Sequence, residues 1–167
     1  MSTTLPEYAN HFEYRDGNLY WKHDRGSQKC EGKMAGTQAH NGYLRVRVRE
    51  LGGSILAHRI IFAMNHGYLP EFVDHIDGNP ANNRIENLRE ATKSENCRNS
   101  KTPTRNTSGV KNVSWHKSRN KWAVHLVVQK RKRFFGLYDD LELADLIAHE
   151  ARNKFYGAFA NHGVKNV

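Results

Sequence analysis

Apolar and charged residues alternate at positions 44–49, where Leu44, Val46 and Val48 are separated by arginines. This period of two predicts a strand with one buried face and one arginine face. The arginines are Arg45, Arg47 and Arg49. Their face is either an ordinary solvated strand surface or a surface that binds phosphates, which would neutralise the clustered charge.

The segments on either side show other patterns. Two short aromatic runs around Asp16-Gly17 predict a hairpin at 12–21, and the polar residues 22–42 predict a loop. Ser54 is placed to cap a helix that Gly67 ends. This helix carries His58, which we interpret as a packing residue, and Arg59, a candidate phosphate contact.

The stretch 72–96 predicts the order strand, loop, strand, helix. Residues 72–76 have strand character, and the residue pairs 77–78 and 79–80, Asp-Gly and Asn-Pro, are strong turn signals. A second extended piece follows at 88–91. Thr92 and Glu95 fit a capping box, so a helix is expected to begin at Lys93.

Hard-metal ligands and an imidazole come together in this stretch. Asp74 and His75 are adjacent on a predicted strand, so they point to opposite faces and are expected to play different roles. Asp74 and Asn96 offer oxygen ligands suited to Mg²⁺ or Mn²⁺, and His75 can take a proton from water near pH 7. The alternative is a purely structural Asp-His pair. A zinc site is poorly supported, because Cys30 and Cys97 belong to no C-x-x-C pair.

Residues 43–100 resemble the HNH, or ββα-metal, nucleases of phage and homing endonucleases. The likeness lies in Ala57-His58-Arg59, in the run from Asp74 to Asn79, in Asn82-Asn83, in Glu86-Asn87-Leu88 and in Asn96. The resemblance implies that His75 is the general base and that Asp74 and Asn96 hold one divalent metal, Mg²⁺ or Mn²⁺, per active site. It also implies that Asn87 ties the loop together and orients His75.

After Asn96 the chain becomes strongly basic. Between Arg98 and Phe135 there are eleven Lys or Arg residues and no Asp or Glu. Residues 98–107 are polar and broken by proline, which predicts a linker lying along a DNA backbone. Its candidate phosphate contacts are Arg98, Lys101 and Arg105.

Beyond the linker, three strands are predicted at 110–115, 121–128 and 133–138. Asp139 and Glu142 form a capping-box candidate, and the helix that follows has an apolar stripe and ends at Gly157. The pattern therefore predicts a three-stranded antiparallel sheet backed by one amphipathic helix.

Residues 108–160 resemble the AP2-type DNA-binding domain. The likeness is carried by Gly109-Val110, Ser114-Trp115, Lys121-Trp122-Ala123, the run from Phe135 to Tyr138 and residues 144–156. The resemblance implies that the sheet lies in the DNA major groove, while Trp122 is either a contact or a core residue. The implied DNA contacts are Lys111, Trp115, Lys117, Lys121, His125 and Arg133.

Composition agrees with a nucleic-acid partner. The 167 residues carry a net charge of +9, and the hydrophobic content of 38% predicts a modest core. Two cysteines give no disulfide framework, and we expect an intracellular protein, in host cytoplasm or nucleoid if phage-encoded. No apolar run reaches the ~20 residues that span a bilayer, so no membrane partner is expected.

These observations predict an α+β protein with a nuclease domain at 1–97, a basic linker at 98–107 and an AP2-like domain at 108–167. The expected function is metal-dependent, site-specific cleavage of double-stranded DNA by a monomer or weak dimer. The alternative is a catalytically silent regulator that binds DNA. RNA binding is disfavoured, because the AP2-like unit resembles readers of duplex DNA.

Overall fold

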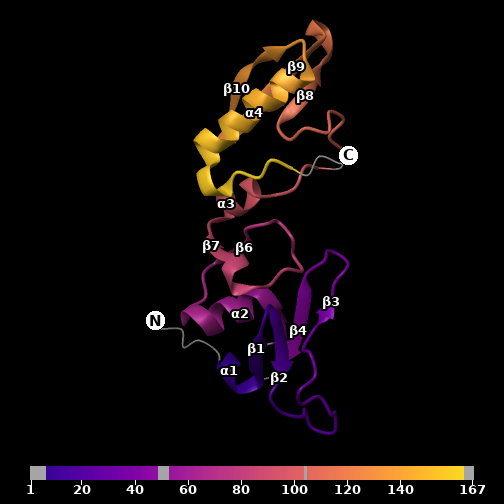
Figure 1. The fold of residues 1–167 in the computed structure, drawn as a ribbon, viewed down its shortest axis with the longest axis vertical. Helices are drawn as coiled ribbons and strands as arrows, with labels where there is room; N and C mark the ends of the chain where they lie inside the picture. The colour runs from indigo at the N-terminus through magenta and orange to yellow at the C-terminus, as the bar shows by residue number, and fades with distance from the viewer. Residues whose placement is uncertain (1–6, 49–52, 104, 164–167) are drawn as a thin grey trace. The chain divides into compact units, whose positions relative to one another are not determined.

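The structure is a computed structural model that describes residues 7–48, 53–103 and 105–163. It is a mixed α/β protein of two compact units, Met1–Lys93 and Ser94–Val167, called here the N-terminal and C-terminal units (Figure 1). The sequence placed this boundary after residue 97, whereas the structure divides the chain at the start of helix α3.

The N-terminal unit consists of short antiparallel sheets around one helix. β1 pairs with β2, β4 lies between β3 and β5, and β6 pairs with β7. The elements are α1 (Tyr8–His11), β1 (Phe12–Arg15), β2 (Asn18–Trp21), β3 (Thr37–Gln38), β4 (Leu44–Val48), β5 (Gly53–Leu56), α2 (Ala57–His66), β6 (Phe72–His75), η1 (Ile85–Asn87) and β7 (Leu88–Ala91).

Helix α2 is the centre of this unit's core. It packs against β2, β4, β5, β6 and β7, and Ile60 and Ile61 are fully buried. Val46 and Val48 of β4 are buried beside it, while Arg45 and Arg47 are exposed, so the predicted alternation is confirmed. Arg49 lies outside the described residues.

Two sequence predictions in this unit are wrong. Ser54 does not cap a helix, because residues 53–56 form β5, whose backbone pairs with β4, and α2 begins only at Ala57. Tertiary pairing with the β4 edge outweighs the local capping signal. The predicted loop at 22–42 also contains the short strand β3, which pairs with β4.

The C-terminal unit is a three-stranded antiparallel sheet, ordered β10-β9-β8, with one long helix packed on it. Its core joins Val113, Val124 and Leu126 of the sheet to Ala144 and Ala148 of the helix. This confirms the predicted order of three strands and a helix. The elements are α3 (Lys93–Arg98), β8 (Val113–His116), η2 (Lys117–Arg119), β9 (Lys121–Val128), β10 (Arg131–Tyr138), α4 (Leu141–Tyr156) and η3 (Gly157–Phe159).

Details of the C-terminal unit differ from the prediction. The N-cap of α4 is Asp140, whose carboxylate accepts hydrogen bonds from the backbone N–H groups of Glu142 and Leu143, rather than Asp139. Asp140 directly precedes α4 and has the extended backbone of an N-cap, while Asp139 pairs with Lys121 across 2.9 Å. The start of the expected linker is held in place, since Asn161 donates hydrogen bonds to the buried Asn99.

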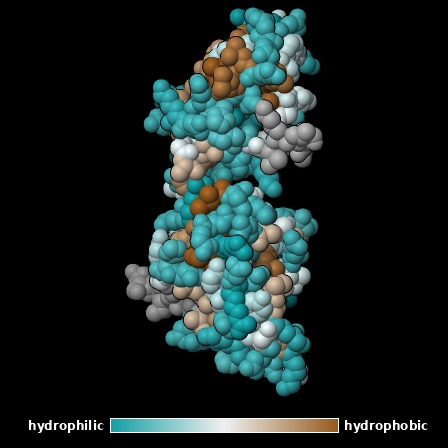
Figure 2. All heavy atoms as spheres, in the orientation of Figure 1, coloured by the Kyte–Doolittle hydropathy of each residue, from teal (hydrophilic) through white to brown (hydrophobic). Residues whose placement is uncertain are grey.

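The surface in view in Figure 2 is mostly hydrophilic, with a hydrophobic patch over α4, where Leu143 and Leu146 are exposed. Within the described part of the chain, no helix has the length and apolar character needed to cross a membrane.

Candidate active site

Asp74 and His75 are the last two residues of β6, which pairs with β7, and both side chains are buried. Asp74 is 5% exposed and His75 is 4% exposed. In the β6–β7 register, Asp74 lies opposite Arg89 and His75 lies opposite Leu88. Neighbouring strand residues point to opposite faces, so the two side chains have separate surroundings, as the sequence predicted.

The Asp74 carboxylate is held by Arg89. The guanidinium approaches Asp74 Oδ2 with Nη2 at 2.7 Å and Nε at 2.9 Å. Both side chains are largely withdrawn from solvent, so removing either would take an ion-pair partner from a largely buried charge. A cation bound at Asp74 therefore has to compete with, or displace, the guanidinium.

His75 is held by a side chain that the sequence did not single out. The amide oxygen of Asn83 lies 2.9 Å from His75 Nε2, and Asn83 is itself 3% exposed. An amide oxygen only accepts hydrogen bonds, so in the neutral imidazole this contact places the proton on Nε2 and the lone pair on Nδ1. The signal for this role was present in the Asn82-Asn83 pair, but the loop geometry decides which amide reaches the ring.

Two further rings surround His75. The His58 ring stands edge-on to it, with centroids 4.8 Å apart, and Tyr43 contacts both, at 5.4 Å and 5.8 Å. Burial, with the neighbouring His75 and Arg59, lowers the pKa of His58 from 6.5 to about 3. His58 is therefore neutral, and it packs against His75 as the sequence interpretation favoured.

Asn87 organises the loop between β6 and β7. Its amide oxygen accepts a hydrogen bond from the backbone N–H of Asp77, and its Nδ2 donates to the carbonyl of Asn82 and to the Asp77 carboxylate. This is the loop-tying position expected of Asn87, whereas the hydrogen bond to the His75 ring comes from Asn83. Asn96 is half-buried on α3.

The basic residues proposed to contact DNA fall into two groups. Exposed positions suited to phosphates are occupied by Arg45, Arg47, Lys101, Arg105 and Lys117. Arg59 has another use in the structure, because its guanidinium donates to the carbonyls of Glu71 and Pro70 before β6. Arg98 is half-buried, with its guanidinium over the Tyr156 ring.

The β8–β10 sheet also divides the predicted contacts. Lys121 and His125 lie on its outer face, away from α4, together with exposed Val127 and Phe134. Here "outer face" means the sheet positions that share the side of His125. The remaining implied contacts, Lys111, Trp115 and Arg133, lie elsewhere.

Each of these three residues also makes a contact within the C-terminal unit. Arg133 pairs with the buried Leu126, and its guanidinium stands over the Phe155 ring of α4. Trp115 pairs with Trp122 on the same side. Lys111 is 7% exposed, and its ammonium donates to the carbonyls of Arg98 and Ser100.

The residues fit a divalent cation in donor chemistry. Among the described residues, no group of three or more His, Cys, Asp and Glu side chains is arranged to hold a metal. Asp74 nevertheless supplies a buried carboxylate, a ligand that Mg²⁺ and Mn²⁺ accept, although a cation there would compete with Arg89. Such a site leaves most of the metal coordination to water and substrate oxygens.

Comparisons with known proteins indicate the family of the chain. Residues 56–98 match the HNH endonuclease family. Protein 3.8 of Escherichia phage T7 is 38% identical to the chain over 105 residues, which are 62% of this chain and 86% of the phage protein. No solved structure matches the chain significantly. The chain therefore belongs to the same family as phage T7 protein 3.8, and its residues 56–98 are an HNH endonuclease domain.

Proposed function

We propose that the protein is a metal-dependent, site-specific DNA endonuclease that hydrolyses phosphodiester bonds. The observation that carries this proposal is the buried Asp74–His75 pair, in which the Asn83 amide oxygen lies 2.9 Å from His75 Nε2 and orients the ring. A fixed ring with a lone pair is what a general base requires. The family match over residues 56–98 supports the same chemistry.

In the proposed mechanism, His75 Nδ1 takes a proton from a water molecule, and the water oxygen attacks the scissile phosphorus. The bond to the 3′ oxygen breaks, and this oxygen takes up a proton, leaving 5′-phosphate and 3′-hydroxyl ends. Asn83 keeps the ring in place, and His58 and Tyr43 shield it from bulk water. This positioning lowers the entropic cost of reaching the transition state.

Asp74 and Asn96 would hold the divalent cation, Mg²⁺ or Mn²⁺, one per active site. The assignment of Asn96 rests on the family motif, since the matched segment runs through residue 98. When bound, such a cation supplies electrostatic stabilisation of the charge that develops on the phosphate and leaving oxygens.

We propose that residues 108–167 act as an AP2-like reader of double-stranded DNA and residues 98–107 follow its backbone, while residues 1–97 cut. The outer face of the sheet, with Lys121 and His125, would face the major groove. Arg45, Arg47, Arg98, Lys101, Arg105 and Lys117 would neutralise phosphates, as expected of a chain with net charge +9. Arg59, Lys111, Trp115 and Arg133 are also proposed as contacts, in addition to the contacts that they make within the fold; Trp115 and Arg133 are exposed. A monomer or weak dimer is expected.

The test is conversion of supercoiled plasmid carrying candidate target DNA, with Mg²⁺, with EDTA and with the His75→Ala variant. We expect cleavage that requires the metal and falls by about 10²–10⁴-fold in the variant, because the general base is lost. Open-circle product would indicate nicking, and linear product paired cuts. His66→Ala, an exposed histidine of α2, is the matched control.

A second candidate is a DNA-binding regulator without turnover. The extended, exposed basic surface favours it, since binding groups outnumber the catalytic ones. This function replaces the first if wild type and His75→Ala bind DNA equally well and neither cuts DNA of the natural host in the presence of Mg²⁺ or Mn²⁺.

A further inference from the structure

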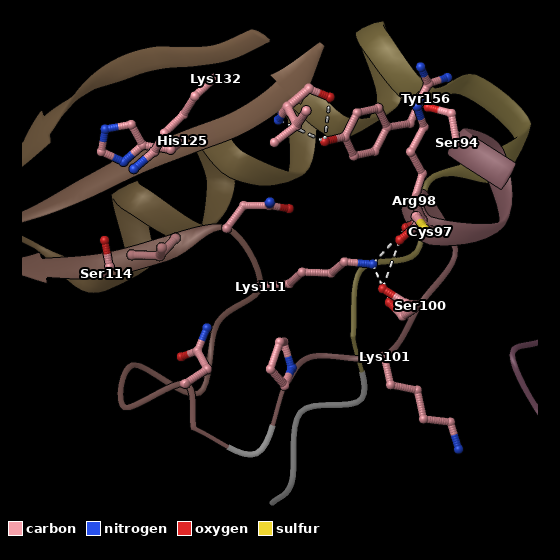
Figure 3. Close-up of a pocket in the computed structure, with 15 residues that line it drawn as sticks. Ser94, Cys97, Arg98, Ser100, Lys101, Lys111, Ser114, His125, Lys132 and Tyr156 are labelled. Atoms are coloured by element: carbon pink, nitrogen blue, oxygen red, sulfur yellow. Dashed lines mark hydrogen bonds between the residues drawn. The ribbon is translucent and has the colours of Figure 1, made fainter. Parts of the chain in front are cut away.

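A hollow of about 500 Å³ lies within the C-terminal unit (Figure 3). One wall is the outer face of the sheet, where Ser114, His125 and Lys132 lie. The opposite wall is α3, whose Ser94, Cys97 and Arg98 share one face of the helix because they are three and four residues apart. The coil after α3 closes a third side.

The lining of the hollow is cationic. None of the 15 lining residues is acidic, whereas four are Lys or Arg and one is His125. Figure 3 shows Lys132 beside His125 at the end away from α3. Lys132 is exposed, and it contributes, after burial, to lowering the pKa of His125. This end of the hollow is therefore electropositive and suited to binding an anion.

Two buried polar atoms of lining residues lack a hydrogen-bond partner within the described chain. They are Arg98 Nε, a donor, and Asn112 Oδ1, an acceptor. Buried polar atoms in native proteins are nearly always paired, so such atoms in the wall of a hollow indicate where a ligand supplies partners. A ligand with both an acceptor and a donor edge, such as a nucleobase, would satisfy both.

Apolar surface completes the lining. Val127 is 54% exposed on the sheet wall, and Tyr156 and Pro103 also line the hollow. Sites for small ligands have volumes of about 300–1,000 Å³, so the hollow has room for a whole nucleotide. A bare phosphate would leave most of it empty and the apolar wall uncovered.

We propose that this hollow binds one unpaired nucleotide of a DNA strand, with the phosphate at Lys132 and His125 and the base edge toward Arg98 and Asn112. The site rests on the proposed function in one respect, namely that the C-terminal unit contacts DNA. Unpaired nucleotides are the ones that enter such sites readily, because no stacking or pairing has to be broken.

The experiment measures binding of the full chain, in EDTA to prevent cleavage, to two DNA duplexes of the same sequence. One is fully paired and the other carries a single bulged nucleotide. We expect the bulged duplex to bind about tenfold more tightly. Lys132→Ala should remove most of that preference, because it deletes the phosphate contact at the hollow.

Arg131→Ala is the matched control. Arg131 precedes Lys132 on the same strand, so its replacement by alanine removes the same charge. Arg131 pairs with Val128, its side chain lies on the other side of the sheet, and it does not line the hollow. This variant should weaken binding of both duplexes equally and keep the preference for the bulge. Val127→Glu provides a second test, since a carboxylate in the hollow should also abolish the preference.

The remaining outcomes overturn the proposal in distinguishable ways. Equal affinity of the wild type for both duplexes would remove the nucleotide site and leave DNA binding intact. A preference that survives both Lys132→Ala and Val127→Glu would place the bulge elsewhere on the protein. Failure to bind either duplex would overturn the proposed DNA binding, and this inference with it.

Discussion

The polar side chains of the β6–β7 region are buried and hydrogen-bonded to one another, whereas those on the outer face of the β8–β10 sheet are half-buried or exposed. Asp74, His75 and Asn83 are between 3% and 5% exposed. On the outer face, even the apolar Val127 and Phe134 are 54% and 58% exposed. The polar residues of the two regions therefore differ in burial and in their hydrogen bonding.

The difference follows from what each region is proposed to do. A general base has to be held within a fraction of an ångström, and packing and hydrogen bonds supply that order. A surface that reads DNA keeps its charges in water until phosphates neutralise them. Substitutions in the buried region are thus expected to have large effects, and substitutions on the open face small, graded ones.

The largest effect is expected from Arg89→Met, which removes the ion pair between Arg89 and the buried Asp74 carboxylate. We expect the free energy of unfolding to fall by about 3 kcal/mol, measured by urea denaturation in EDTA. If Asp74 also binds the metal, added Mg²⁺ should restore stability more in this variant than in the wild type.

The double variant Asp74→Leu/Arg89→Met is the control for this prediction. It removes both charges, so it should be more stable than Arg89→Met alone, with no response to Mg²⁺. A loss below about 1 kcal/mol in Arg89→Met would show that the ion pair behaves like an exposed one, and the contrast between the two regions would disappear.

Asn83→Leu should lower the cleavage rate by about 10–100-fold, because His75 loses the acceptor that fixes its proton on Nε2. Asn83→Asp keeps an accepting oxygen and adds a negative charge that favours protonated His75, so its rate should recover at higher pH. The measurement is the pH dependence of cleavage for both variants. An unchanged profile in Asn83→Asp would exclude a role for Asn83 in positioning the base.

The lowered pKa of His58 predicts how the free energy of unfolding responds to acid. Its pKa is lowered to about 3 in the folded protein, so between pH 6.5 and 3 the unfolded chain binds more protons at this position. The contribution of His58 to the free energy of unfolding is fully present above pH 6.5. It decreases as the pH falls, by about 2 kcal/mol at pH 5. His58→Phe should therefore lose less stability between pH 7 and pH 5 than the wild type, as measured by thermal unfolding.

The exposed His66 of the same helix gives the control for that measurement. His66→Phe should retain the wild-type loss of stability between pH 7 and pH 5. Equal acid responses in wild type and His58→Phe would mean that His58 is not kept neutral by the fold.

Much of this architecture was predictable because its signals are local. The alternation of Val46 and Val48 with arginines identified β4, and the capping and turn signals around 77–80 and 92–95 located the ββα segment. These signals depend on backbone periodicity or on the chemistry of a few neighbouring residues, which the sequence carries directly.

What the sequence could not supply depends on register and loop closure. The capping signal at Ser54 was overridden because β4 pairs with residues 53–56. Arg133 was assigned to the DNA side, yet its pairing with Leu126 turns it toward α4. Asn83 contacts His75 from eight positions further along the chain, a contact that no local pattern encodes.

The smallest expected effect concerns Lys121 on the outer face of the sheet. Its ion pair with Asp139, at 2.9 Å, is largely solvated, with side-chain exposures of 39% and 80%, so Lys121→Ala should leave stability nearly unchanged. Binding to DNA should weaken, and the slope of log affinity against log salt should become shallower by about 0.9, the contribution of one phosphate.

Lys29→Ala in the N-terminal unit is the matched control, since Lys29 forms a similarly exposed ion pair with Asp24. Both variants lose one positive charge, but only Lys121 lies on the proposed reading face. The slope is measured between 50 and 200 mM salt with the His75→Ala background, so that cleavage does not interfere. Equal changes in slope for the two variants would mean that net charge, rather than the sheet surface, determines binding, and the open face would lose its assigned part in recognition.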